Sequence, residues 1–277
     1  MASFLCLTLL CLTAAINAQW YKHDPKTHWH YRHDPKGWPM GDCQSTNRQS
    51  PVKLSTKSGI TCSENLGWIN IDGFRSQIRV NLVNSGKTLV GIGAPGENLG
   101  RISVTLDNKK YLLKQFHFHW SGQDSHPQGS EHSIDGAFTD VEMHLVFTEA
   151  DTTLEIDSIA ILAVLIKADS YRDNWKFAKL FNVGLSDMYI TKMKSVPGSI
   201  SLGSLLYGVD FNNYFRYEGS MTTPPCSENV KWTVFRDPIS ISKTQLEQLR
   251  SLIAVGRTGN FRIAFDPTPG NKVEFTC

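Results

Sequence analysis

The chain has 277 residues, of which 40% are hydrophobic, and its 28 basic residues nearly balance 26 acidic ones. This is enough apolar material for a sizeable core. A net charge of +2, with 7 Trp and 14 Phe, excludes a disordered chain and favours neither a nucleic-acid nor an anionic-membrane partner.

The first 18 residues have the pattern of a targeting segment. An apolar run from Phe4 to Ile16 ends in Ile16-Asn17-Ala18, which predicts a signal peptide over 1–18. The run is shorter than a membrane span, so a retained anchor is the weaker alternative. We expect a secreted, extracellular protein with no membrane partner.

Residues 19–40 form a second unusual segment. The sequence Tyr-Lys-His-Asp-Pro-Lys at 21–26 is echoed at 31–36, and the segment holds four of the nine histidines, namely His23, His28, His30 and His33. Prolines and charges predict an exposed arm. The arm is either solvated without a task, or a loose metal binder or proton relay. The remainder, 41–277, contains no linker and is predicted to be one domain.

The body of the chain is predicted to be mainly β, with a few short helices. Alternating or continuous apolar patterns predict strands at 77–82, 102–106, 115–120, 141–147 and 156–168. Helices are predicted at 173–181 and at 242–252, with Ser242 as the N-cap of the second.

Four cysteines remain after the signal peptide. Cys43, Cys62, Cys226 and Cys277 are an even number in a secreted chain, which predicts two disulfides with three possible pairings. Free buried thiols are the alternative.

The segment Gln115-Phe116-His117-Phe118-His119-Trp120 carries the first chemical signal. Side chains alternate along a strand, so His117 and His119 share one face with Gln115. Two imidazoles at this spacing can reach one metal ion, although a single His-x-His motif is weak.

A third histidine strengthens the signal. Glu142 and His144 share a face of the predicted strand at 141–147, which could pair with the first strand and bring His144 to the same ion. Three histidines without a fourth ligand are typical of a catalytic zinc site. Gln115 and Glu142 are the candidates to orient the ligand rings.

These motifs resemble those of the α-class carbonic anhydrases. The resemblance rests on Gln-Phe-His-Phe-His-Trp, Ser-Glu-His-Ser-Ile-Asp-Gly, Glu-Met-His-Leu-Val and Gly-Ser-Met-Thr-Thr-Pro-Pro-Cys, with Gln49-Ser50-Pro51-Val52 and Trp29-x-Tyr31 as early landmarks. It covers roughly residues 29–277. It implies a large, twisted, mostly antiparallel sheet, one Zn²⁺ per chain, and hydration of carbon dioxide to bicarbonate by zinc-bound hydroxide.

The resemblance also implies individual roles. Thr222 would accept a hydrogen bond from the hydroxide and donate one to Glu131, and Thr223 would contact bicarbonate. Inhibition by sulfonamides and anions is expected. The apolar wall for carbon dioxide would comprise Val146, Ile161, Met221, Val230 and Trp232.

One position departs from the family pattern. Fast members place a proton-shuttle histidine where this chain has Lys87, whose ordinary pKa near 10.4 makes it a poor shuttle at neutral pH. We therefore expect slow, buffer-dependent turnover. Tyr31 and Asn84 match residues that order water in the family.

The resemblance also favours one pairing of the cysteines. It implies a Cys43–Cys226 bond, with Cys62–Cys277 as the second bond or Cys277 free for intermolecular pairing.

The sequence disfavours three other functions. A non-catalytic relative would commonly lack a zinc histidine, and a mineral-matrix protein would carry acidic or Gly-Asn repeats. A metalloprotease would need His-Glu-x-x-His, which does not occur.

Overall fold

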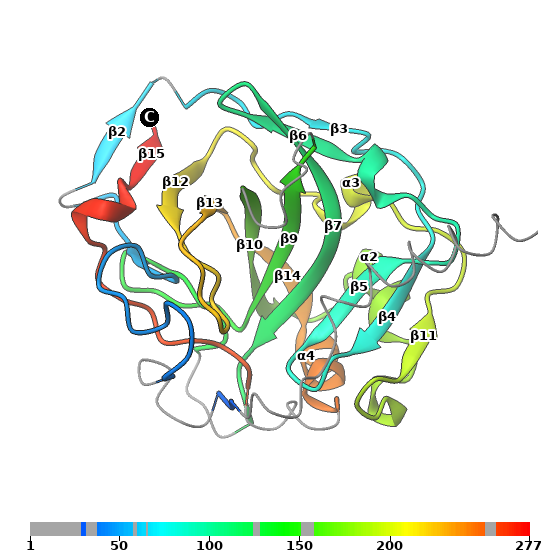
Figure 1. Ribbon diagram of the computed structural model, residues 1–277. Coiled ribbons are helices and arrows are strands. Elements are labelled where there is room, and N and C mark those ends of the chain that lie inside the picture. The colour runs from blue at the N-terminus through cyan, green and yellow to red at the C-terminus, as the bar shows by residue number, and fades with distance from the viewer. Residues whose placement is uncertain are drawn as a thin grey trace, which may run out of the picture.

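A computed structural model describes residues 29–31, 38–57, 60–64, 66–123, 128–150, 158–252 and 259–277 (Figure 1). The predicted signal peptide and most of the histidine-rich arm lie outside these residues. No helix in the described ranges is long and apolar enough to cross a membrane.

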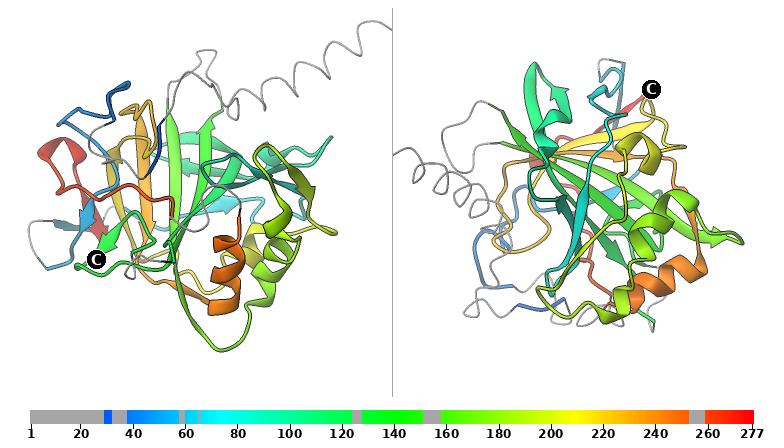
Figure 2. Two further views of the ribbon diagram at one scale, coloured as in Figure 1. Left: turned by 90° about the horizontal axis from the view of Figure 1, so that it is seen from below. Right: turned by 90° about the vertical axis from the view of Figure 1, so that its right-hand side faces the viewer.

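The protein is mainly β, as predicted, and one mixed, mostly antiparallel sheet dominates it (Figures 1 and 2). Its strands follow the order β11 (Met193–Ser195), β4 (Val80–Asn84), β5 (Leu89–Gly93), β7 (Lys109–Trp120), β9 (Val141–Glu149), β10 (Ile159–Ser170), β13 (Val230–Phe235), β12 (Tyr214–Gly219), β15 (Glu274–Thr276) and β2 (Thr61–Ser63).

Shorter elements complete the sheet and its surroundings. The strands β14 (Ile239–Ser242), β3 (Ile71–Asp72) and β6 (Ser103–Leu106) branch from the main path, and β1 (Lys53–Leu54) pairs with β8 (Ser133–Ile134). The helices are α2 (Trp175–Phe181), α3 (Leu202–Leu205) and α4 (Lys243–Arg250), with 3₁₀ turns η1 (Leu99–Arg101), η2 (Leu185–Asp187) and η3 (Pro269–Asn271).

The predicted elements are present with shifted ends. The strand expected from residue 77 begins at Val80, and Ile78 makes only an isolated bridge to Ile200. The helix expected over 242–252 is α4, and Ser242 caps it in a capping box with Gln245. The helix expected from 173 begins at Trp175, because the Asn174 side chain accepts a hydrogen bond from the Lys176 N–H as its N-cap.

The central strands place different chemistry on the two faces of the sheet. Phe116, Phe118 and Trp120 are fully buried in the larger core, which the apolar sides of α2, α3 and α4 also join. A second core, which includes Val146 and Trp232, lies on the opposite face. The alternation of β7 and β9 therefore divides packing residues from the histidines, as a strand period of two requires.

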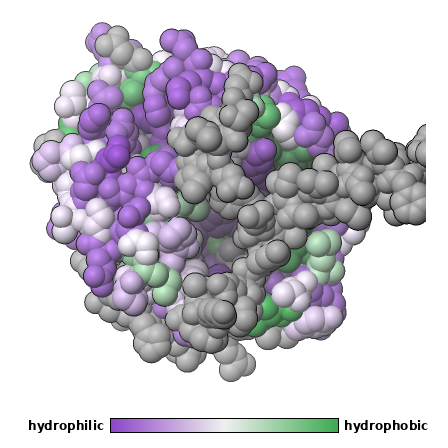
Figure 3. Space-filling model, in the orientation of Figure 1, coloured by the Kyte–Doolittle hydropathy of each residue, from purple (hydrophilic) through white to green (hydrophobic). Residues whose placement is uncertain are grey.

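Where described residues form the surface in the orientation of Figure 1, it is predominantly hydrophilic, with small separate hydrophobic areas (Figure 3). The structure contains the disulfides Cys43–Cys226 and Cys62–Cys277. The first is buried and joins the N-terminal segment to the loop after β12, and the second links β2 to the residue after β15. The pairing implied by the resemblance is the one observed.

Candidate active site

Three histidines converge at the centre of the sheet. His117 and His119 extend from β7, and antiparallel pairing with β9 places His144 directly opposite His117. The three rings are buried, with centroids 4.6 to 5.0 Å apart. One nitrogen from each ring lies within 4.8 Å of the other two, which is close enough for all three to ligate one ion.

Two of the rings are oriented through their Nδ1 atoms. His117 Nδ1 lies 3.0 Å from Gln115 Oε1, and His119 Nδ1 lies 2.7 Å from the Asn260 carbonyl oxygen. Because these oxygens can only accept, each Nδ1 carries the proton and each Nε2 presents a lone pair. The His119 Nε2 atom is buried without a hydrogen-bond partner, which fits a metal ligand and no structural role.

The third ring is oriented by a carboxylate. His144 Nε2 donates to Glu142 Oε1 at 2.7 Å, so its Nδ1 presents the lone pair, 3.2 Å from His117 Nε2. Glu142 also accepts hydrogen bonds from the backbone N–H groups of Glu131 and His132 and from His132 Nδ1. Burial alone would raise the pKa of Glu142, but His132 and His144 hold it well below its ordinary value. The carboxylate is therefore ionised and fully satisfied, as a buried charge requires.

The histidines themselves are kept neutral. Burial lowers the pKa of His119 from 6.5 to about 3, and burial together with the two neighbouring imidazoles holds the pKa of His117 well below 6.5. Burial also lowers the pKa of His144, against the opposing effect of Glu142. Neutral imidazole is the form that binds a metal ion.

A second pair of residues flanks the histidines. Glu131 Oε1 accepts a hydrogen bond from the Arg262 backbone N–H at 2.9 Å, and Glu131 Oε2 is buried without a hydrogen-bond partner. Burial and the Glu142 carboxylate raise the pKa of Glu131, while the neighbouring Thr222 side chain and the Arg262 N–H oppose the rise. Glu131 Oε1 also lies 3.3 Å from His119 Nδ1. The pair is therefore built into the same buried site as the histidines.

The candidate wall residues are brought together. Four of them are buried members of the second core, namely Val146, Ile161, Val230 and Trp232. Met221 is partly buried and packs against this core. The Trp232 ring lies 4.9 Å from the His144 ring. The apolar surface is therefore continuous with the histidine cluster, and Thr223, one residue beyond Thr222, is half-buried.

The comparisons with known proteins agree with this geometry. Residues 28–265 match the family model described as eukaryotic-type carbonic anhydrase. The chain belongs to this family. It is 34% identical to carbonic anhydrase 6 of Bos taurus over 229 residues, which cover 79% of this chain and 69% of the relative. It is 35% identical to carbonic anhydrase 4 of Oryctolagus cuniculus over 228 residues (78% and 70%), and 30% identical to carbonic anhydrase 3 of Homo sapiens over 239 residues (84% and 85%).

Membership makes this chain a carbonic anhydrase, an enzyme that hydrates carbon dioxide.

The departure from the family pattern at Lys87 has a defined structural setting in this carbonic anhydrase. Lys87 Nζ donates to the Trp29 carbonyl oxygen and lies 4.5 Å from the centre of the Trp29 ring. Burial lowers the pKa of Lys87. The Asn84 side chain donates to the Met188 carbonyl oxygen and accepts from the Gly86 N–H, so it fixes the turn that carries Lys87. Tyr31 packs edge-on against Trp29.

Sequence reasoning missed two contributors to the site. Asn260 orients His119 through a main-chain carbonyl, which any residue type could supply, so no sequence signal marks it. His132 links Glu142 to Tyr217, whose hydroxyl lies 2.7 Å from His132 Nε2 and donates to Ser50 Oγ at 3.0 Å. His132 stands directly after Glu131 in a quoted motif, but its partners come from segments distant in the chain.

Proposed function

We propose that this chain is a secreted, zinc-dependent carbonic anhydrase in which His117, His119 and His144 hold one Zn²⁺. The observation that carries the proposal is the buried, unpartnered Nε2 of His119, which faces the free nitrogens of the other two rings. A buried nitrogen without a partner is costly unless a ligand occupies its lone pair. Three neutral imidazoles form a donor set that suits zinc.

The metal would supply one element of the chemistry. In carbonic anhydrases, bound zinc lowers the pKa of its water from about 16 to about 7, which provides a hydroxide nucleophile at neutral pH. Gln115, Glu142 and the Asn260 carbonyl would fix the three rings and strengthen them as donors.

Thr222 and Glu131 would orient the nucleophilic oxygen. The Thr222 hydroxyl would give its proton to Glu131, whose pKa the Thr222 side chain lowers, so its Oγ1 would only accept a further hydrogen bond. A nucleophile that donates to Oγ1 has its remaining lone pair turned in a defined direction. The wall formed by Val146, Ile161, Met221, Val230 and Trp232 would hold carbon dioxide, and Thr223 would contact bicarbonate.

The proton released in the reaction needs a separate exit. Lys87 stands at the position of the expected shuttle, and its ammonium group is held against Trp29 rather than left free. Tyr31 and Asn84 would order water along the remaining path. An ammonium group seldom releases its proton at neutral pH, so Lys87 would carry protons out of the site slowly. We therefore infer that turnover depends on external buffer.

Carbon dioxide hydration by stopped flow tests the proposal, with His119→Ala as the decisive variant. The wild type should hydrate carbon dioxide, and a sulfonamide should block it. His119→Ala should lose the activity, whereas the control His30→Ala, outside the cluster, should keep it. Activity that survives in His119→Ala would refute the role of the histidine cluster.

A further inference from the structure

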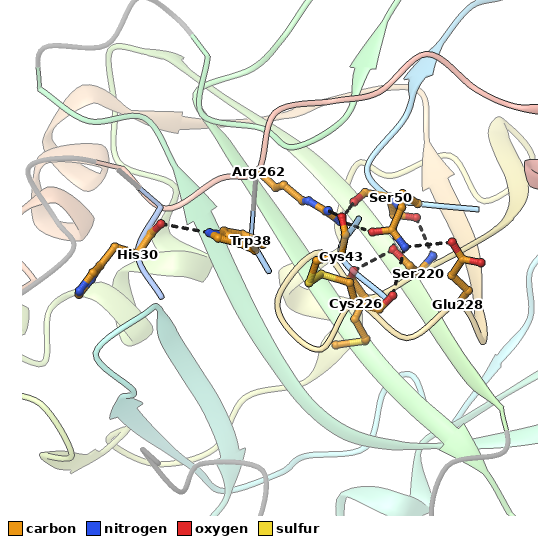
Figure 4. Close-up of a disulfide and its surroundings, with 10 residues drawn as sticks. His30, Trp38, Cys43, Ser50, Ser220, Cys226, Glu228 and Arg262 are labelled. Carbon is orange, nitrogen blue, oxygen red and sulfur yellow. Dashed lines mark hydrogen bonds between the residues drawn. A yellow bond between two sulfur atoms is a disulfide. The ribbon is translucent and has the colours of Figure 1, made fainter. Parts of the chain in front are cut away.

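Arg262 is an arginine whose side chain is fully buried, with 0% exposed. Its Nη1 donates to Gln49 Oε1 and to the Ser50 carbonyl oxygen, both at 2.8 Å, and its Nη2 donates to the Cys43 carbonyl oxygen at 2.9 Å (Figure 4). The guanidinium also lies 5.3 Å from the Trp38 ring centre. One side chain therefore holds three points of the segment 43–50.

Each of these three residues is in turn attached to the loop that carries Thr222. Cys43 is joined by its disulfide to Cys226, and Ser50 N–H donates to Ser220 Oγ at 2.9 Å. Gln49 Nε2 donates to the Cys226 carbonyl oxygen at 3.3 Å (Figure 4).

A further bond from Gln49 Nε2 reaches Glu228 Oε1 at 3.0 Å. These attachments lie on both sides of Thr222 in the sequence, at residue 220 and at residues 226 and 228. The position of Thr222 is therefore set through the segment that Arg262 holds.

Arg262 also contacts the other member of the pair directly. Its backbone N–H donates to Glu131 Oε1 at 2.9 Å, on the carboxyl group whose pKa the neighbouring Thr222 side chain lowers. Burial lowers the pKa of Arg262 to about 10, so the guanidinium remains charged at neutral pH, and Glu131 is the carboxylate that opposes this shift. A buried charge is retained only where its donors are well paired.

We infer that Arg262 is a positioning residue that sets the alignment of Thr222 with Glu131. This inference rests on the proposed function. The backbone of Arg262 fixes Glu131, and its guanidinium fixes Thr222 through Cys43, Gln49 and Ser50. Replacing the guanidinium should let the loop move relative to Glu131 while the three histidines, held by other groups, keep their geometry.

Two probes that bind at the metal separate this role from general stability. A primary sulfonamide brings a proton that can be donated to Thr222 Oγ1, whereas thiocyanate has none. Loss of the alignment should therefore weaken the sulfonamide alone. Arg216→Met is the matched control, because Arg216 is a half-buried arginine on β12 that donates to Thr233 Oγ1.

The experiment measures zinc content, sulfonamide affinity and thiocyanate affinity in the wild type, Arg262→Met, Arg262→Lys and Arg216→Met. In Arg262→Met we expect sulfonamide affinity to fall about tenfold or more, as for a lost hydrogen bond to a charged ligand. Zinc content and thiocyanate affinity should be unchanged, Arg262→Lys should recover part of the loss, and the control should match the wild type. Should Arg262→Met fail to fold, Gln49→Ala removes one acceptor and should show the same selective loss.

The inference would be overturned if Arg262→Met and Gln49→Ala bound both probes with wild-type affinity. It would also be overturned if the two variants lost affinity for both probes to the same extent. A wild type that holds no zinc and binds neither probe would refute the proposed function itself, and the inference with it.

Discussion

Glu142 offers the sharpest test of how the site holds a metal. It is fully buried on β9 and accepts four N–H groups, two from backbone and two from the imidazoles of His132 and His144. In Glu142→Gln the amide keeps one oxygen and turns an NH₂ group toward the remaining donors. Both imidazoles donate to Oε1 and both backbone N–H groups to Oε2, and the backbone groups cannot change tautomer, so the amide oxygen takes the Oε2 position. The NH₂ group then faces both imidazoles, and His144 is no longer held in the tautomer that presents Nδ1.

The magnitude follows from the loss of that outer partner. Removing such a group weakens metal binding about 10–100-fold, or about 1.4–2.7 kcal/mol of binding free energy. Two unpaired buried donors would also lower the free energy of unfolding by about 2–6 kcal/mol. Chelator competition on folded protein, checked by circular dichroism, gives the zinc dissociation constant.

Glu149→Gln is the control for this measurement. Glu149 lies on the same strand, but its carboxylate pairs with Lys109 at 3.1 Å, away from the histidines. Its zinc affinity should equal that of the wild type. A folded Glu142→Gln protein with wild-type zinc affinity would refute the assigned role of this carboxylate.

Three further predictions follow from the described residues. Lys87→His should raise carbon dioxide hydration in weak buffer about tenfold or more, and an unchanged rate would exclude proton transfer at this position as the limit. Because burial lowers the pKa of His119 from 6.5 to about 3, the unfolded state binds more protons between these values. His119 alone should therefore make zinc-free protein lose about 1.4 kcal/mol of unfolding free energy per pH unit as pH falls below 6.5. His117 and His144, whose pKa values are also lowered, should add to this loss; a flat profile in urea titrations would contradict it. Cys62 and Cys277 are exposed, while the other disulfide is buried. Mild reduction followed by alkylation should therefore modify Cys62 and Cys277 first and leave the carbon dioxide hydration activity intact, as peptide mapping and an activity assay would show. Alkylation of the buried pair first would disprove this.

The local part of the site could be predicted from sequence because strand periodicity is a local property. Alternation along 115–120 and 141–147 placed three histidines on the polar side of their strands, and a buried carboxylate at position 142 demanded a partner. The same alternation separated the two cores. The register that sets His117 opposite His144 depends on pairing across the sheet, and only the structure supplies it.

Other parts of the site depend on contacts between distant segments. The Asn260 carbonyl and the Arg262 guanidinium reach residues about 140 and 210 positions away, and neither has a local pattern that announces its partner. Strand ends were missed for a related reason. The apolar pattern continues through Ile78, but the continuous ladder begins only where β5 supplies a partner for Val80.

The most direct test of the central claim is a zinc titration of metal-free protein, with carbon dioxide hydration measured by stopped flow at each addition. We expect no hydration without zinc, a linear rise with added zinc, and a plateau at one zinc per chain. Full hydration in the metal-free protein, or one tightly bound zinc per chain without hydration, would contradict this claim.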